Sequence, residues 1–328
     1  MSGKSEELVA CVPNFSEGKN EATIELLCEA IRRFENEGVV LLDVDPDPAY
    51  NRVVITFAGP PKGVYLAAFE SIKVAYHFID MRHHKGQHPR FGAADVVPFV
   101  PVTAGIETCI ELAKKLAKKV ADELEVPVYL YGEAAQIPER ENLAYVRKGE
   151  YEGLADRLKT PEGKPDFGPA VFVPHFGACA IGARYPLIAF NITLDTSDVE
   201  IAREIARKIR ESGYKGVPGK FKKVRAIGVK LEGKPYVQVS CDLVDYRVSG
   251  LAEVFEEVKK LAAEKGVDVV DSELVGFVPK EALVLAGKFY SEELSSEREL
   301  IALAAEKMKL RDFDMDKDVM EYRLGIED

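Results

Sequence analysis

Four of the five histidines in this 328-residue sequence lie within twelve positions, at His77, His83, His84 and His88. The fifth, His175, lies far along the chain. Imidazole can transfer protons near neutral pH and can also ligate metal ions. The cluster is therefore a candidate metal site or acid–base site, and the alternative is an ordinary polar loop.

The spacing of the cluster does not favour a metal. His84 and His88 are four residues apart, which on a helix would present both rings to one ion. Gly86 lies between them and Pro89 follows, and a residue before proline avoids the helical region. The sequence offers no clear third ligand nearby, and none of its five cysteines forms a C-x-x-C pair. We therefore expect no metal.

An acid–base role requires one imidazole held in a cleft near its natural pKa. A loop between a helix and a buried strand suits that role, because loops on rigid scaffolds often carry catalytic groups. The alternative is that these histidines are solvated or make structural hydrogen bonds. Arg82, Lys85 and Arg90 flank the rings and favour a functional loop that binds anions.

Two further segments carry groups that could act on a ligand. In DVDPDPAYNR, residues 43–52, Asp45 could orient a histidine or accept a substrate N–H, and Arg52 could hold a carboxylate. A solvated turn is the alternative there. In GPAVFVPHFG, residues 168–177, two phenylalanines and a histidine could receive a flat aromatic ligand. A packed linker between domains is the alternative for that segment.

Periodicity predicts the elements that would position these segments. In the first half, strands are expected at 8–12, 39–45, 52–58, 96–102 and 127–131, with helices at 21–37, 61–79 and 106–124. Residues 132–185 look irregular. In the second half, strands are expected at 187–194, 224–231, 236–239 and 268–274, with helices that end near 212, 265 and 289.

Each half therefore begins β-α-β-β-α-β, the element order of ferredoxin-like folds. We expect an α/β (α+β) protein with two such subdomains, residues 1–184 and 185–290, with helices outside and a ligand cleft or tunnel between them. Residues 291–328 are expected to form a charged helical tail.

Composition excludes some functions. A net charge of −11 argues against a nucleic-acid partner, although it does not exclude a small anionic ligand. The sequence has no run of eighteen apolar residues and no apolar leader, so we expect no membrane partner. Widely spaced cysteines fit a cytoplasmic location.

The sequence resembles the glutamate formiminotransferases, the transferase part of the bifunctional formiminotransferase–cyclodeaminases. The resemblance covers about residues 7–290 and rests on CVPNFSEG (11–18), LLDVDPDPAYNR (41–52), HKGQHPRFGAAD (84–95), VPVYLYGEAA (126–135), PDFGPAVFVPHFGA (165–178), LIAFNITL (187–194) and LVGFVPKEAL (274–283). Only residues 291–328 follow, so we expect a monofunctional form without the cyclodeaminase part.

The resemblance implies two α/β subdomains with a ligand tunnel, and transfer of a formimino group from N-formimino-L-glutamate to tetrahydrofolate in histidine degradation and one-carbon metabolism. It implies a catalytic histidine at His88, no metal and a homodimer. It also implies that the folate co-substrate binds the segment formed by Gly168, Pro169, Ala170, Val171, Phe172, Val173, Pro174, His175, Phe176 and Gly177. A separate cyclodeaminase would be a partner that consumes the product.

The reaction requires one proton to leave the attacking amine and one to reach the leaving amine, and one histidine can do both. We expect Arg52, Lys85 and Arg90 to pair with substrate carboxylates. Asp45 is expected to orient the histidine or the amidinium.

Three alternatives stay open on the sequence. The donor could be N-formylglutamate, the chain could be a folate-binding or partner-binding module without turnover, or it could be a metal-dependent hydrolase built on His83, His84 and His88.

Overall fold

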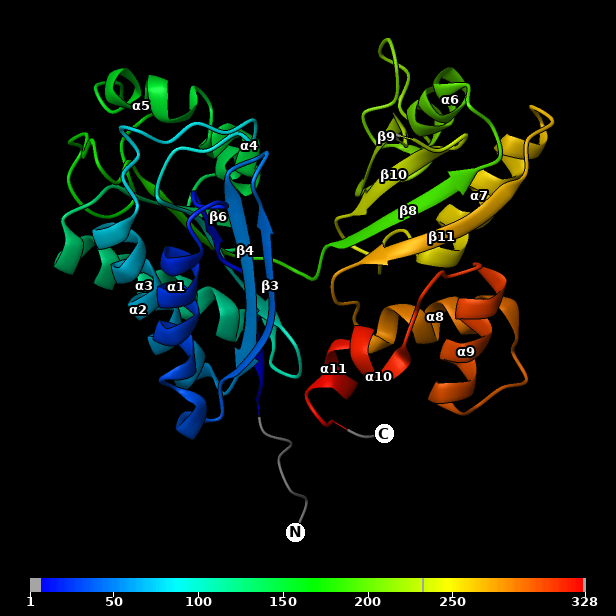
Figure 1. Ribbon diagram of the computed structural model, residues 1–328, viewed down its shortest axis with the longest axis horizontal. Coiled ribbons are helices and arrows are strands. Elements are labelled where there is room, and N and C mark those ends of the chain that lie inside the picture. Colours follow the sequence, from blue (N-terminus) through cyan, green and yellow to red (C-terminus); the bar gives the residue numbers. More distant parts are fainter. Residues whose placement is uncertain (1–6, 232, 327–328) are drawn as a thin grey trace. The chain divides into compact units, whose positions relative to one another are not determined.

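The computed structural model describes residues 7–231 and 233–326 (Figure 1). They form two compact units, of which the first ends at Arg184 and the second begins at Tyr185. Each unit has its own sheet and its own hydrophobic core. The predicted α/β class is confirmed, and so is the order β-α-β-β-α-β in the second half. The first half has this order with one added short strand, Asn14–Phe15, before its first helix.

The first unit contains a seven-stranded sheet. Its strands are β1 (Val9–Cys11), β2 (Asn14–Phe15), β3 (Val40–Asp47), β4 (Arg52–Gly59), β5 (Ala94–Pro101), β6 (Val128–Gly132) and β7 (Cys179–Ala183). Its helices are α1 (Glu21–Arg32), α2 (Pro61–Phe78), α3 (Ile106–Leu124), α4 (Leu143–Val146) and α5 (Glu150–Arg157), with 3₁₀ turns at Glu35–Glu37 and Pro138–Glu141.

Strand pairing brings distant segments of the first unit together. Strand β3 pairs with β4, and β4 pairs with both β1 and β2, all antiparallel. Strands β1 and β2 in turn pair with β5. The start of β4 and the segment before β5 are therefore neighbours, which places residues near 52 beside residues near 90.

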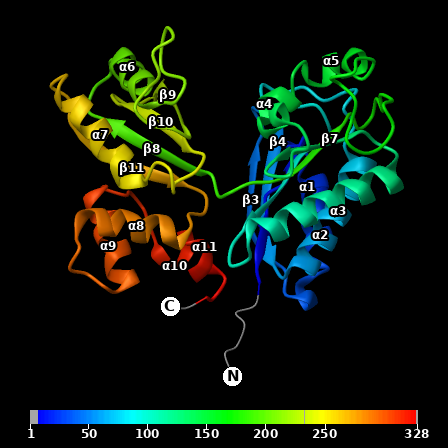
Figure 2. The ribbon, with the colours of Figure 1, turned by 180° about the vertical axis from the view of Figure 1, so that it is seen from behind.

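Each face of the first sheet carries a hydrophobic core. Helices α1, α2 and α3 lie against one face (Figures 1 and 2), where Val128 and Leu130 of β6 join the main core. The alternate residues Tyr129 and Tyr131 point to the other face, where they pack with Val146 and Leu154 of α4 and α5. Because successive side chains of β6 point to opposite faces of the sheet, this strand contributes residues to both cores.

Two expectations for the first unit need correction. The helix expected over 21–37 ends at Arg32, because the chain turns through Glu35–Glu37 and reaches Gly38 at a φ of 79°. Residues 132–185 are not all irregular, since β7 lies between β5 and β6 and runs parallel to both. All five residues of β7 are buried. The strand was not predicted because it is short and is flanked by glycines and prolines, which are typical of loops.

The second unit contains a four-stranded antiparallel sheet in the order β11-β8-β10-β9. Its elements are β8 (Ile188–Leu194), α6 (Val199–Ile209), β9 (Val224–Lys230), β10 (Val237–Leu243), α7 (Leu251–Ala263), β11 (Val269–Val275) and α8 (Lys280–Tyr290). Alternate residues of β8, namely Ile188, Phe190, Ile192 and Leu194, pack with α6 and α7 on one face. Asp198 caps α6 by accepting a hydrogen bond from the backbone N–H of Glu200.

The charged segment after Tyr290 is helical as expected, but it is not separate from the second core. It forms α9 (Glu297–Lys307), α10 (Met315–Asp318) and α11 (Met320–Arg323). Leu300, Ile301, Ala304 and Met308 are buried in the core of the second unit. These four apolar residues stand among many charged ones, so the sequence did not indicate a buried helix face. In the structure they form one helix face against α8. None of the helices described is long and apolar enough to span a bilayer.

Candidate functional site

The histidine loop, residues 79–93, joins the end of α2 to β5 and contains no helix or strand of its own. Within it, Nε2 of His88 lies 3.0 Å from Nη1 of Arg52, at the start of β4. The guanidinium can only donate, so Nε2 of His88 is the acceptor and the proton of the neutral ring lies on Nδ1. The same Arg52 nitrogen donates to Oδ1 of Asn14 at 3.0 Å.

His88 is half-buried, and its surroundings disfavour the charged ring. Burial, followed by the positive charges of Arg52 and Arg147, lowers the pKa of His88 to about 4. The imidazole is therefore neutral at pH 7, and the lone pair that would take a proton is that of Nε2, to which Arg52 donates. The neutral ring is the protonation state that a general base needs.

Arg147 and Asp95 extend the site into the interior of the first unit. Nη2 of Arg147 lies 2.6 Å from Oδ2 of Asp95, whose side chain is only 3% exposed. The backbone N–H of Phe91 donates to the other oxygen of Asp95 at 2.9 Å. Burial raises the pKa of Asp95, which its partner Arg147 opposes. Asp95 is the last residue of the motif HKGQHPRFGAAD quoted above. Arg147 could not be predicted from its neighbours in sequence, because its partner lies 52 residues away.

Asn51 holds the histidine loop against the turn before β4. Its Oδ1 accepts from the N–H of Gly18 at 3.0 Å, and its Nδ2 donates to the carbonyl of Lys85 at 3.0 Å. Its own carbonyl lies 2.8 Å from Nε2 of His84. Asn51 has a φ of 50°, a conformation that asparagine tolerates better than most residues. Asn51 was not predicted as a site residue, although it stands next to Arg52 in a quoted motif.

His84 has a structural role in this loop. Its Nε2–H donates to the Asn51 carbonyl, so its Nδ1 is left to accept from Nε of Arg90 at 3.3 Å. Burial lowers the pKa of His84, which keeps the ring in this neutral form. Both ring nitrogens are thus used within the protein.

Arg90 does not stand ready for a substrate carboxylate, which corrects the expectation from sequence. Its two terminal nitrogens each donate to a different oxygen of Glu152 at 2.8 Å. The Arg90 side chain is only 10% exposed, and a second carboxylate, Glu150, lies 3.6 Å away. The guanidinium fork is therefore already filled by an acidic residue of the same unit.

Asp45 also differs from the expectation, whereas Lys85 does not. Asp45 is exposed on β3, and it makes no hydrogen bond to His88 in the described structure. The partner of His88 is instead Arg52, so Asp45 does not orient the imidazole. Lys85 is exposed, and within 7–231 and 233–326 its ammonium has neither a hydrogen bond nor an ion pair. Its charge is available to a ligand.

The segment Gly168–Gly177 docks on the histidine loop through its backbone. The N–H of Met81 donates to the carbonyl of His175 at 2.8 Å, and that of Ala93 donates to Phe176 at 2.7 Å. The segment also keeps exposed apolar surface, since Val171 is 62% exposed. The structure thus brings the first and third candidate segments together.

The histidines do not converge on one point. Nε2 of His84 and Nε2 of His88 contact different partners, and His83 and His77 are exposed. Within the part of the chain that the structure describes, no group of three or more His, Cys, Asp or Glu side chains could hold a metal ion.

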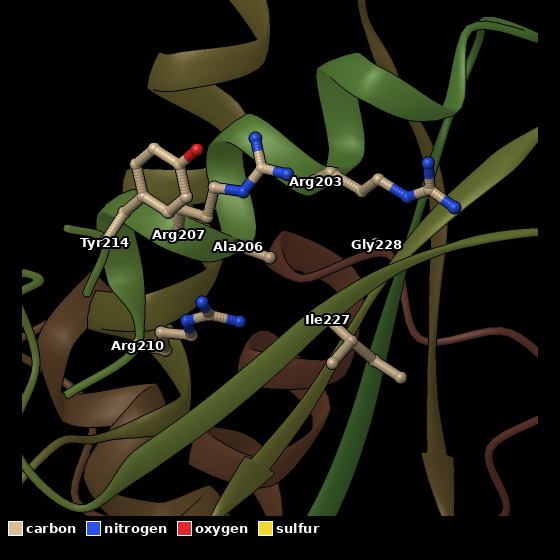
Figure 3. Close-up of a pocket in the computed structure, with 7 residues that line it drawn as sticks. All are labelled: Arg203, Ala206, Arg207, Arg210, Tyr214, Ile227 and Gly228. Atoms are coloured by element: carbon tan, nitrogen blue, oxygen red, sulfur yellow. The ribbon is translucent and has the colours of Figure 1, made fainter. Parts of the chain in front are cut away.

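A separate cavity of about 350 Å³ lies in the second unit (Figure 3). It is lined by Arg203, Ala206, Arg207, Arg210, Tyr214, Ile227 and Gly228. Glu200 lies 2.6 Å from Arg203 and 4.0 Å from Arg207, so their charges are partly balanced. Arg210 donates to the backbone carbonyls of Gly213 and Ala226. The lining contains no acid–base histidine, and we assign no reaction to it.

Comparisons with known proteins agree with the resemblance. Residues 8–184 match the N-terminal subdomain of the formiminotransferase domain, and residues 189–325 match the formiminotransferase domain. A glutamate formimidoyltransferase of Thermoplasma acidophilum is 46% identical over 286 residues, which are 86% of this chain and 92% of that protein. One of Streptococcus pyogenes serotype M1 is 39% identical over 97% of this chain and 99% of that protein. The formimidoyltransferase-cyclodeaminase of Rattus norvegicus is 46% identical over 96% of this chain, which spans only 60% of that relative's length.

Proposed function

The chain belongs to the formiminotransferase family, and we propose that it transfers the formimino group of N-formimino-L-glutamate to tetrahydrofolate. The products would be 5-formimino-tetrahydrofolate and L-glutamate, a step of histidine degradation that feeds one-carbon metabolism. The observation that carries the proposal is His88, a half-buried imidazole kept neutral beside Arg52.

The chemistry needs one group that accepts a proton and returns it. The N5 amine of tetrahydrofolate attacks the amidine carbon of the donor, which forms a C–N5 bond and a tetrahedral intermediate. In this proposal His88 takes the proton from N5 and then delivers it to the leaving amine of glutamate as the old C–N bond breaks. Such general acid–base catalysis typically contributes a factor of about 10²–10⁴. Holding both substrates in register supplies further acceleration.

Charge supports particular roles for the residues around His88. Among the described residues, the hydrogen-bond partners of Arg52 are the neutral side chains of Asn14 and His88, both on its Nη1, so it can still receive a substrate carboxylate. Exposed Lys85 can pair with a second one. Asp45 is retained in the proposal only as an acceptor for the amidinium, because it is exposed and lies apart from the imidazole.

We infer that tetrahydrofolate binds along Gly168–Gly177. The segment is joined by backbone hydrogen bonds to the loop that carries His88. Its exposed valine and half-exposed Phe172 offer apolar surface to a flat ring. A pterin bound there would lie near the proposed proton-transfer group.

Location and partners are part of the same proposal. All five cysteines are buried and unpaired, which supports a reducing compartment such as the cytoplasm. Several relatives carry cyclodeaminase in their names, so we infer that a cyclodeaminase consumes the product. A homodimer remains the expected assembly.

The test is an assay of purified protein with tetrahydrofolate and either N-formimino-L-glutamate or N-formyl-L-glutamate. Release of L-glutamate, together with the change in pterin absorbance, measures the transfer. We expect turnover with the formimino donor and at least about tenfold less kcat/KM with the formyl donor. Turnover with the formyl donor alone, or with neither donor, would contradict the proposal.

A further inference from the structure

We propose that Arg147 is a substrate-binding residue that forms, together with Arg52, a buried receptor for one carboxylate. This inference rests on the proposed function and assigns a role to a residue that the sequence motifs do not mark. It is carried by the contacts that each arginine makes, by the buried donor that each leaves unsatisfied, and by the action of both charges on His88.

The two arginines that act on His88 differ in their direct contacts. Arg147 pairs with Asp95 at 2.6 Å, which neutralises one guanidinium. Arg52 donates to the neutral Asn14 and His88, and among the described residues no carboxylate lies within ion-pair distance of it. Asp45, Asp95 and Asp47 act on Arg52 only from farther away. Among the described residues, the one carboxylate in contact with this pair of arginines is therefore Asp95, on Arg147, and the guanidinium of Arg52 can still pair with an anion.

Both guanidiniums have a buried donor still to satisfy. The Nε atoms of Arg52 and Arg147 are buried, and neither has a hydrogen-bond partner in the described structure. An unsatisfied buried donor is costly, and a carboxylate presents two oxygens that can accept from such donors. Nε of Arg140 is also without a partner, but its guanidinium lies 2.7 Å from Asp166 and does not act on His88. Arg140 is therefore a matched control.

An anion in the receptor would act on His88. Burial, Arg52 and Arg147 hold the pKa of His88 near 4, and Asp47 on β3 opposes them. Asp95 on β5 is paired with Arg147, and the Tyr50 ring lies 5.9 Å from the imidazole. A bound carboxylate would offset the two positive charges, so the pKa of His88 would rise towards its ordinary value near 6.5. Substrate binding would thus make His88 a stronger base when it is needed.

The carboxylate could come from either substrate, because N-formimino-L-glutamate and the glutamyl part of tetrahydrofolate each carry two. Kinetics of Arg147→Lys distinguish the two sources. Lysine keeps the charge beside Asp95 but loses the planar fork. We expect KM to rise about tenfold or more for the substrate that fills the receptor and to change little for the other. Tetrahydropteroate, which lacks the glutamyl part, serves as a second acceptor.

Arg140→Lys is the control for this experiment. It makes the same change in another buried arginine–aspartate pair of the same unit. We expect both KM values of that variant to stay within about twofold of wild type. A similar change in KM from both variants, or none from Arg147→Lys, would overturn the proposal.

A second readout does not depend on turnover. The His88 ring is followed by NMR, with its signals identified by comparison with His88→Gln, while glutarate is added at several pH values. In the wild type, glutarate should raise the pKa of His88 by about one unit or more. This rise in the pKa of His88 should be lost in Arg147→Lys. It should also be lost in the double variant Asp95→Asn/Arg147→Gln, which removes both charges of the pair and replaces Arg147→Lys if that variant does not fold.

Glutarate separates failure of this proposal from failure of the proposed function. A glutarate-dependent shift in wild type without formimino transfer would support the receptor and reject the reaction. Formimino transfer without any glutarate-dependent shift, or with the same shift in Arg147→Lys, would support the reaction and reject the receptor.

Discussion

Nη1 of Arg52 lies 3.0 Å from Nε2 of His88, so a cationic donor occupies the nitrogen that would accept a proton. The two residues are 36 positions apart, and the antiparallel pairing of β4 with β1 and β2, beside β5, brings their segments together. Burial, together with this contact, keeps the imidazole neutral, and the contact fixes one tautomer. In the proposed function, the contact would couple the proton-transfer group to a carboxylate-binding group.

The low pKa of His88 predicts a dependence of stability on pH. Its pKa is about 4 in the folded protein and near 6.5 in an unfolded chain, so the unfolded state binds more protons between these values. The contribution of His88 is present above about pH 6.5 and is lost as the pH falls through 4. Half-buried His84 and His175, whose pKa values burial also lowers, act in the same direction.

His88→Gln should therefore show a smaller loss of Tm than wild type between pH 7 and 4. Thermal unfolding monitored by circular dichroism measures this difference. His83→Gln, at an exposed position of the same loop, is the control and should follow wild type. Parallel curves for all three proteins would show that His88 titrates normally.

Two substitutions of Asn51 should lower the free energy of unfolding by different amounts. Asn51→Gly keeps the positive φ accessible but removes two hydrogen bonds of the side chain, which should cost about 1–3 kcal/mol. Asn51→Ala should cost about 1 kcal/mol more, because alanine disfavours a φ of 50°. Urea unfolding gives both values. The reverse order of the two variants would contradict the assigned backbone conformation.

Gly86 lies where the histidine loop passes closest to the turn before β4. A Cβ at this position would lie 2.0 Å from the backbone oxygen of Tyr50, so Gly86→Ala must displace the loop that carries His88. We expect kcat to fall at least about tenfold, since misplacement of a catalytic group by 1 Å can cost about 100-fold. In the control Gly153→Ala, the new Cβ meets no atom within 4 Å, and helix propensity should add up to about 1 kcal/mol of stability. Full activity of Gly86→Ala would contradict this packing.

Glu152 tests the conclusion that Arg90 is structural. Glu152→Gln removes the charge that fills the Arg90 fork, and because the carboxylate is largely exposed it should cost only about 1 kcal/mol of stability. Both KM values should stay within about twofold of wild type. If Arg90 instead receives a substrate carboxylate, removal of its competitor should lower one KM severalfold.

The sequence predicted the elements well because their hydrophobic periods are long and regular. The helix over Ile106–Leu124 has the predicted bounds, and the strands of the second sheet alternate clearly. Short elements escaped prediction: β7 has five residues among glycines and prolines, and its place between β5 and β6 depends on pairing with strands far along the chain.

Candidate side chains could be predicted by type but not by partner. His88 and Arg52 stood in unusual motifs, and the structure brings them into contact. Arg90 looked equally suitable in the sequence, yet Glu152, which is 62 residues away, fills its fork. Arg147 was not predicted as a candidate, because it is placed near the site by a buried contact with Asp95. Partners this far apart in sequence are set by tertiary packing, which residue types and local spacing do not encode.

The most direct test of His88 as the proton-transfer group is the rate of formimino transfer in His88→Ala, measured beside wild type and His83→Ala. Far-UV circular dichroism and a tetrahydrofolate-binding measurement accompany the rates. We expect kcat of His88→Ala to fall by about 10²–10⁴-fold with folding and folate binding retained, and His83→Ala to match wild type. If His88→Ala folds, binds folate and keeps kcat within about threefold of wild type, another residue transfers the proton.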